Sequence, residues 1–180
     1  TQYMLSYTDW LVNSKIYTGA LVHRFGNNVF GISVVNAKPE AVKETTDLKP
    51  LGTGNMIDAS DIAVGVAYAR QMTDKVSWGG HARYVREDLF LVTSSSYQFD
   101  LGISAYTGYK SLRVAASARN VGGETTVEVR SFSPPIYFNF AVAAEIYGDV
   151  GDPTYLTVAT ETLFATDYGQ RWHFGGELWL

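Results

Sequence analysis

The stretch that decides the fold is "KVSWGGHARYVRE", residues 75–87. Two adjacent glycines in its middle would each cost a helix about 1 kcal/mol relative to alanine. At a period of two residues the same stretch separates cleanly, with Trp78 and Tyr84 on one face and His81 and Arg83 on the other. The stretch therefore predicts a β-strand with one apolar face and one polar face.

Composition extends this prediction to the whole chain. The 180 residues suit a single domain over positions 1–180, and the 14% aromatic content is typical of strands. A net charge of −4 argues against a nucleic-acid-binding protein, which would carry a basic face. The absence of cysteine excludes disulfides, thiolate metal ligands and cysteine nucleophiles. No apolar run approaches the roughly 18 residues of a membrane helix, whereas a barrel strand needs only about 9 to 11.

Alternating runs bounded by turn-forming residues predict ten strands and no helix. They are 2–8, 14–25, 28–45, 60–72, 75–88, 96–107, 111–121, 125–147 with a break at Pro134 and Pro135, 154–165 and 170–180. The connections at 26–27, 73–74, 108–110 and 148–153 are short, and those at 9–13, 46–59, 89–95, 122–135 and 166–169 are generally longer. Such alternation is typical of an up-and-down antiparallel meander, as in outer-membrane barrels with short turns at one end.

The two faces of the predicted strands differ in composition. In the strand 60–72, for example, Ile62, Val64, Val66 and Tyr68 alternate with alanine and glycine. A soluble sandwich would instead favour Lys, Glu and Thr on its outer face. Small residues with sparse charges fit a face enclosed by a barrel, and Tyr and Trp near the strand ends suit interfacial aromatic girdles.

The polar side chains on the small-residue face are the candidate functional residues. A turn centred on 109–110 places Asp100 opposite Arg119, and a turn centred on 91–92 places it opposite Arg83. Such a row either fixes strand register within a lumen or holds a plug or an acidic ligand group. Arg171 and the glutamates of the later strands are expected to form a similar belt. The full set expected to face the lumen and contact a ligand is His81, Arg83, Asp100, Arg113, Arg119, Asn139, Glu145, Glu161, His173 and Glu177.

Catalytic and metal-binding motifs are absent from the sequence. His23, His81 and His173 are far apart and lack a second ligand two or four residues away, so no metal site is expected. No Gly-x-Ser-x-Gly, phosphate-binding loop or His-Glu-x-x-His motif occurs. We therefore expect a non-enzymatic protein without cofactors. An outer-membrane hydrolase is disfavoured because the sequence shows no nucleophile beside its base.

Several segments resemble the PorV/PorQ family of FadL-like outer-membrane barrel proteins of Gram-negative bacteria. They are "SYTDWL" (6–11), "SDIAVGVAYARQMTDKVSWGGHARYVRE" (60–87), "GYKSLRVAASARNVG" (108–122), and "YLTVATE" (155–161) running on to "WHFGGELWL" (172–180). These segments occur in order over most of the chain. The most specific is "DIAVGVAYAR", followed by a short turn and a Gly-rich strand.

The resemblance implies a 14-stranded barrel in the outer membrane with an N-terminal hatch. Some members of that family work in type IX secretion, where they hand cargo with C-terminal signal domains to the surface machinery, and FadL relatives pass hydrophobic molecules. The sequence lacks the family's hatch region and stops about where closing strands would follow. We therefore expect a partial barrel with exposed edge strands at 2–8 and 172–180. The resemblance implies no catalytic residue.

The sequence thus predicts an all-β, antiparallel up-and-down meander of about ten strands that is part of a transmembrane outer-membrane β-barrel. The expected function is handling of secretion cargo. The expected partners are outer-membrane lipid, cargo with C-terminal signal domains and other secretion components, without nucleic acid. A conduit for hydrophobic small molecules is the first alternative. A soluble β-sandwich that binds small hydrophobic or carbohydrate ligands is the second.

Overall fold

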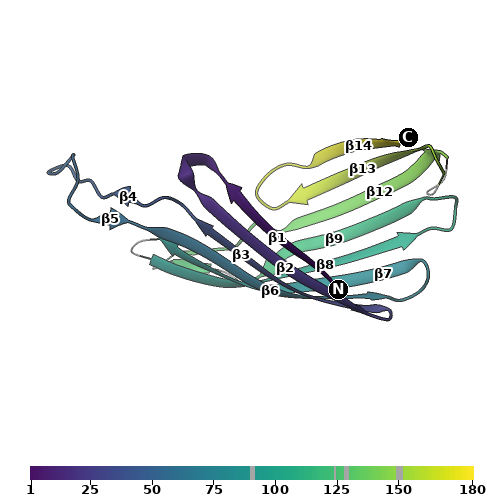
Figure 1. The fold of residues 1–180 in the computed structure, drawn as a ribbon, viewed down its shortest axis with the longest axis horizontal. Helices are drawn as coiled ribbons and strands as arrows, with labels where there is room; N and C mark the ends of the chain where they lie inside the picture. The colour runs from purple at the N-terminus through teal and green to yellow at the C-terminus, as the bar shows by residue number, and fades with distance from the viewer. Residues whose placement is uncertain (90–91, 124, 128–129, 149–151) are drawn as a thin grey trace.

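The computed structural model describes residues 1–89, 92–123, 125–127, 130–148 and 152–180. They form one ten-stranded antiparallel sheet in which strands follow one another in chain order (Figure 1). Its strands are β1 (Gln2–Asp9), β2 (Lys15–Phe25), β3 (Asn28–Lys38), β6 (Ala59–Gln71), β7 (Val76–Leu89), β8 (Val92–Tyr106), β9 (Arg113–Gly122), β12 (Tyr137–Tyr147), β13 (Tyr155–Ala165) and β14 (Arg171–Trp179). The predicted ten-stranded meander is confirmed.

The sheet is twisted and curved but open, as Figure 1 shows. β1 and β14 lie at its two edges and, within the described residues, each pairs on one side only. The smaller elements are two hairpins, β4 (Val42–Lys43) with β5 (Met56–Ile57) and β10 (Thr125–Val127) with β11 (Arg130–Phe132), and the short 3-10 helix η1 (Leu11–Asn13). No helix in the described ranges is long and apolar enough to cross a membrane.

The third strand of the sheet is shorter than the predicted range 28–45. β3 ends at Lys38 because the next residue, Pro39, has no N–H to continue the ladder. The chain then forms a separate hairpin in which Glu44 exchanges backbone hydrogen bonds with Thr53 and Asn55. The side chains of Thr53 and Asn55 donate hydrogen bonds to the Glu44 carboxylate, which lowers the pKa of this carboxyl.

The connection between β7 and β8 is also shorter than predicted. β7 continues to Leu89 and β8 begins at Val92, so the long loop expected at 89–95 is wrong. The serine cluster that indicated a loop is part of the strand, where Ser94 and Ser96 alternate with outward residues and are buried. Residues 90–91 of this connection, and parts of the predicted connections 122–135 and 148–153, lie outside the described residues.

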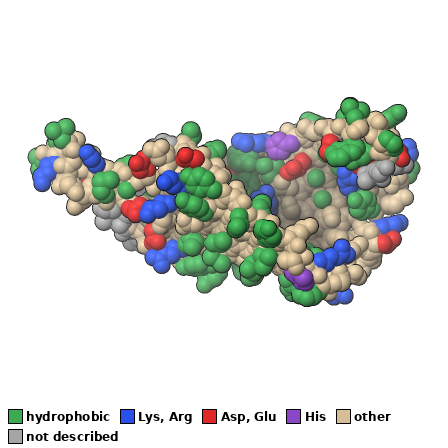
Figure 2. Space-filling model, viewed as in Figure 1, with side chains coloured by type: hydrophobic (Ala, Val, Ile, Leu, Met, Phe, Trp, Pro, Cys, Tyr) green, Lys and Arg blue, Asp and Glu red, His purple; other side chains and the backbone are tan. Residues whose placement is uncertain are grey.

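The sheet is a single layer with two different faces. Large apolar side chains cover its convex face, and Ile32, Val66 and Phe140 are all more than half exposed there. Alanine, glycine, serine and most of the charged residues in the middle of the sheet occupy the concave face, whereas Arg70, Arg86 and Asp88 share the convex face. In Figure 2 hydrophobic side chains gather over β1 to β3, whereas the hollow beside them is mostly tan. Among the described residues no hydrophobic side chain is buried, so the sheet has no core of its own.

The register of β7 on β8 can be tested directly because the chain has no cysteine. Ser77 lies opposite Ser104, so Ser77→Cys combined with Ser104→Cys is expected to form a disulfide under mild oxidation. A turn centred on 91–92 would instead place Ser77 opposite Tyr106, a diagonal neighbour roughly 7–8 Å away in the observed register. Non-reducing electrophoresis and intact mass measure the cross-link. Faster cross-linking of the pair Ser77→Cys and Tyr106→Cys would contradict this register.

Candidate functional site

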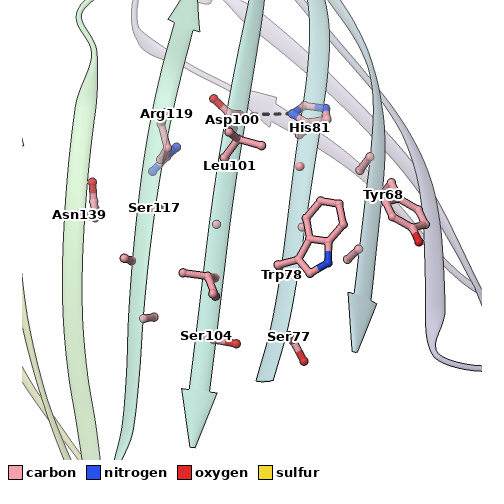
Figure 3. Close-up of a pocket in the computed structure, with 18 of the residues that line it drawn as sticks. Tyr68, Ser77, Trp78, His81, Asp100, Leu101, Ser104, Ser117, Arg119 and Asn139 are labelled. Atoms are coloured by element: carbon pink, nitrogen blue, oxygen red, sulfur yellow. Dashed lines mark hydrogen bonds and ion pairs between the residues drawn. The ribbon is translucent and has the colours of Figure 1, made fainter. Parts of the chain in front are cut away.

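The concave face carries an open hollow of about 790 Å³ that extends from β2 to β13. Most of the side chains that line it are small, including Gly31, Ala67, Gly102 and Ala115. Polar side chains enter the hollow at only a few places, and Figure 3 shows His81, Asp100, Arg119 and Asn139 among them. A second hollow of about 450 Å³ lies between β8 and β14. The concave face is therefore an apolar trough with sparse polar groups.

All ten residues expected from the sequence lie on the concave face, because the strand registers place them on the same side of the sheet. They are His81, Arg83, Asp100, Arg113, Arg119, Asn139, Glu145, Glu161, His173 and Glu177. Three groups of them are in contact: His81 and Arg83 with Asp100, Arg113 with Glu145, and Asn139 with Glu161. Within the described residues, the side chains of Arg119, His173 and Glu177 make no hydrogen bond or ion pair.

Asp100 is the centre of the largest polar cluster. Arg83 Nη1 lies 2.6 Å from Asp100 Oδ2, and the backbone N–H of Asn120 donates to Asp100 Oδ1 at 2.8 Å. Arg83 also donates to the side chains of Gln98 and Asn120. The carboxylate is four-fifths shielded from solvent, so these charge-assisted hydrogen bonds compensate for its desolvation.

The predicted row of Arg83, Asp100 and Arg119 is only partly correct. Arg83 does contact Asp100, but it reaches it diagonally, because the residue opposite Asp100 is His81. Arg119 makes no hydrogen bond or ion pair with Asp100 in the described structure. The register between β8 and β9 shifts near Asp100, and Asn120, with a φ of 59°, directs its N–H at the carboxylate instead. This β-bulge could not be located by counting from the turn.

Two residues that the sequence did not indicate, Ser33 and Gly65, complete this cluster. The His81 ring lies between Asp100 Oδ2, 3.4 Å from Nδ1, and Ser33 Oγ, 3.2 Å from Nε2. Ser33 is on β3, separated from β7 by β6, and the ring reaches it across Gly65. A Cβ on residue 65 would overlap Nε2, so any other residue there would displace the ring. The sequence carried one signal for this contact, which was a glycine, Gly65, opposite Arg83 and flanked by alanines on its strand face.

Arg113 and Glu145 form the most shielded ion pair of the described chain. Arg113 Nη1 lies 2.7 Å from Glu145 Oε1, and the Glu145 side chain is only 1% exposed. Thr157 Oγ1 donates to the same oxygen, and Ser111 Oγ accepts the backbone N–H of Glu145. The pair therefore joins β9, β12 and β13. Glu145 Oε2 has no hydrogen-bond partner in the described structure.

The remaining polar residues of the later strands form no charged belt. Asn139 donates a hydrogen bond to Glu161 across β12 and β13, and Glu161 lies in register with His173. The guanidinium of Arg171, expected to pair with a glutamate, lies 4.0 Å from the centre of the Tyr168 ring. Cation–π contact with this turn residue replaces the ion pair.

Sequence comparisons do not assign the chain to a family. No protein-family model matches the chain, and no curated protein matches its sequence. The described residues also contain no group of three or more His, Asp or Glu side chains placed to hold a metal ion. The functional argument therefore depends on the geometry of the sheet and of its concave face.

Replacement of Arg113 tests the shielded ion pair. Arg113→Ala leaves the Glu145 carboxylate buried without its cation, and a loss of about 3 kcal/mol in the free energy of unfolding is expected. The matched control is Arg86→Ala, which breaks an exposed pair with Asp88 and should cost much less, because water already solvates both charges. Urea unfolding in detergent micelles, followed by tryptophan fluorescence, measures both. Equal losses of unfolding free energy in the Arg113→Ala and Arg86→Ala variants would show that the ion pair of Arg113 with Glu145 is not shielded.

Proposed function

We propose that this chain forms most of the wall of an outer-membrane β-barrel. The observation that carries the proposal is the convex apolar face, which no second layer covers in the described structure. A sheet in water buries one face against another layer, and large exposed apolar patches mark contacts with protein or membrane. Lipid solvates such a face without a second sheet, while the concave face encloses the polar groups.

The placement of aromatic rings supports this orientation. Towards one end of the sheet, Tyr68 on the convex face contacts Phe30 and Trp78, with ring centres 5.2 and 5.6 Å apart. Further along the same face, the rings of Tyr84 and Tyr97 are 5.3 Å apart. These rings lie on the same face as Val66 and the other large apolar residues. Aromatic side chains on the lipid-facing surface are common in outer-membrane barrels.

The free edges of β1 and β14 need partners in this proposal, because unsatisfied backbone groups are costly within a membrane. Pairing of these edges, directly or through additional strands, closes the sheet into a barrel. The single ten-stranded sheet does not support the alternative of a soluble sandwich, since the other described strands form only two small hairpins.

We propose further that the barrel is an accessory of type IX secretion that handles cargo at the outer membrane. Support for this role comes from the sequence segments that resemble the PorV/PorQ family. A conduit for hydrophobic small molecules is a second candidate, which the mostly small, apolar lining of the concave hollow favours.

Arginine substitutions at two depths on β6 test the membrane position. Val64, in the middle of the strand, and Ser60, near its end, both face outward. Val64→Arg is expected to cost about 2–4 kcal/mol in a bilayer, and Ser60→Arg about 0–1 kcal/mol, because the penalty for charge falls towards the interface. Reversible unfolding in lipid vesicles measures both free energies.

On an exposed face in water, both arginine substitutions would change the stability by about 0.5 kcal/mol or less. Equal stabilities of the Val64→Arg and Ser60→Arg variants would therefore contradict the membrane position. So would a native protein that remains monomeric in water without detergent.

The role of the barrel is tested with the full-length protein in its native membrane. Capture from detergent-solubilised membranes should recover secreted proteins that carry C-terminal signal domains, identified by mass spectrometry. Saturable passage of a hydrophobic fluorescent probe through the reconstituted protein, without recovery of such cargo, would favour the conduit. If the protein neither captured such cargo nor passed the probe, both proposed roles would be wrong. The proposed membrane position would be unaffected.

A further inference from the structure

We propose that Ser33 is a nucleophile activated by His81, and that the concave face hydrolyses activated esters. The proposal rests on the order of atoms across β3, β7 and β8. Ser33 Oγ lies 3.2 Å from His81 Nε2, and His81 Nδ1 lies 3.4 Å from Asp100 Oδ2. A nucleophile at one ring nitrogen and a carboxylate at the other is the arrangement of serine hydrolases, recognised by geometry rather than sequence position.

Asp100 is held in place as a positioning residue. Arg83 and the Asn120 amide fix the carboxylate, which keeps one oxygen directed at His81 Nδ1. Donation from Nδ1–H to Asp100 selects the tautomer whose Nε2 accepts the Ser33 proton. Arg83 shares Oδ2, so it reduces the charge available to a protonated imidazole.

Access to the site is open from the concave face. The His81 side chain is 27% exposed, and His81, Asp100, Gly31 and Ala67 line the large hollow. Ser33 lies on the same face, two residues beyond Gly31 along β3. An acyl group of a substrate can therefore lie along the small, apolar lining while its carbonyl carbon approaches Ser33 Oγ.

The chemistry requires only water as a second reactant. Ser33 Oγ bonds to the carbonyl carbon as its proton moves to His81 Nε2, and the bond from that carbon to the leaving oxygen then breaks. The leaving alcohol or phenol takes the proton from Nε2. Water repeats the sequence on the acyl-serine, which releases the carboxylic acid and returns the proton to Ser33.

The strand environment restricts the substrate class. β3 is paired on both sides, so the backbone amides around Ser33 are engaged in the ladder and cannot form an oxyanion hole. Loss of a single oxyanion donor slows acyl transfer about 10²–10³-fold in known hydrolases. We therefore expect turnover of aryl esters, whose leaving groups depart readily, and no cleavage of amides.

A fluorophosphonate probe tests the proposal on the folded protein in detergent micelles. The serine oxygen displaces fluoride from phosphorus, and peptide mass spectrometry locates the adduct. Wild type should be labelled at Ser33, and the Ser33→Ala variant should lose both this adduct and the hydrolysis of a p-nitrophenyl ester. The matched control Ser6→Ala removes a serine of the same face that does not line this hollow and makes no contact with histidine in the described structure, and it should label normally.

The contribution of His81 is tested by His81→Asn, which should slow labelling about 100-fold through loss of the general base. Gly65→Ala provides a second variant, because it keeps all three groups but displaces the ring, and should slow labelling as well. Unfolding curves matched to wild type confirm that each variant is folded. Labelling of another serine, or an unchanged rate in folded His81→Asn, would overturn the proposal. Neither result depends on membrane position or cargo.

Discussion

The alternation of side chains across one layer of sheet is the constraint on which the rest of this structure depends. Every second residue of each strand faces the same side, so a slip of one residue would exchange the two faces entirely. The strand registers keep most of the large apolar side chains on one side and gather the polar clusters of Asp100 and Glu145 on the other. No second layer covers the apolar side in the described chain. Something outside the described chain must therefore cover these side chains.

Small residues on the concave face allow polar side chains to interact across several strands. Neighbouring strands are separated by about 4.8 Å, so a side chain normally reaches only the adjacent strand. His81 reaches Ser33 beyond β6 because Gly65 leaves room for its ring. The small residues of the concave face therefore allow Ser33, His81 and Asp100 to lie in one row.

Sequence reasoning predicted the number, order and facing of the strands because a period of two is visible in single residues. It failed where geometry depends on irregularities. A serine-rich segment at the start of β8 resembled a loop, and the resulting turn centre shifted the expected partner of Asp100 from His81 to Arg83. The contact between Arg83 and Asp100 was still predicted correctly, since a long side chain tolerates a diagonal position.

The polar site was harder to predict than the fold because it depends on relationships among distant strands. Ser33 and His81 are 48 residues apart, and no spacing rule connects them. Asn120 enters the cluster only because a bulge places its amide at Asp100, and asparagine is one of the few residues that adopt its positive φ readily. A bulge that aims an amide at one carboxylate oxygen leaves the other oxygen for Arg83 and His81. The β-bulge at Asp100 is thus the place where the largest polar cluster of the sheet forms.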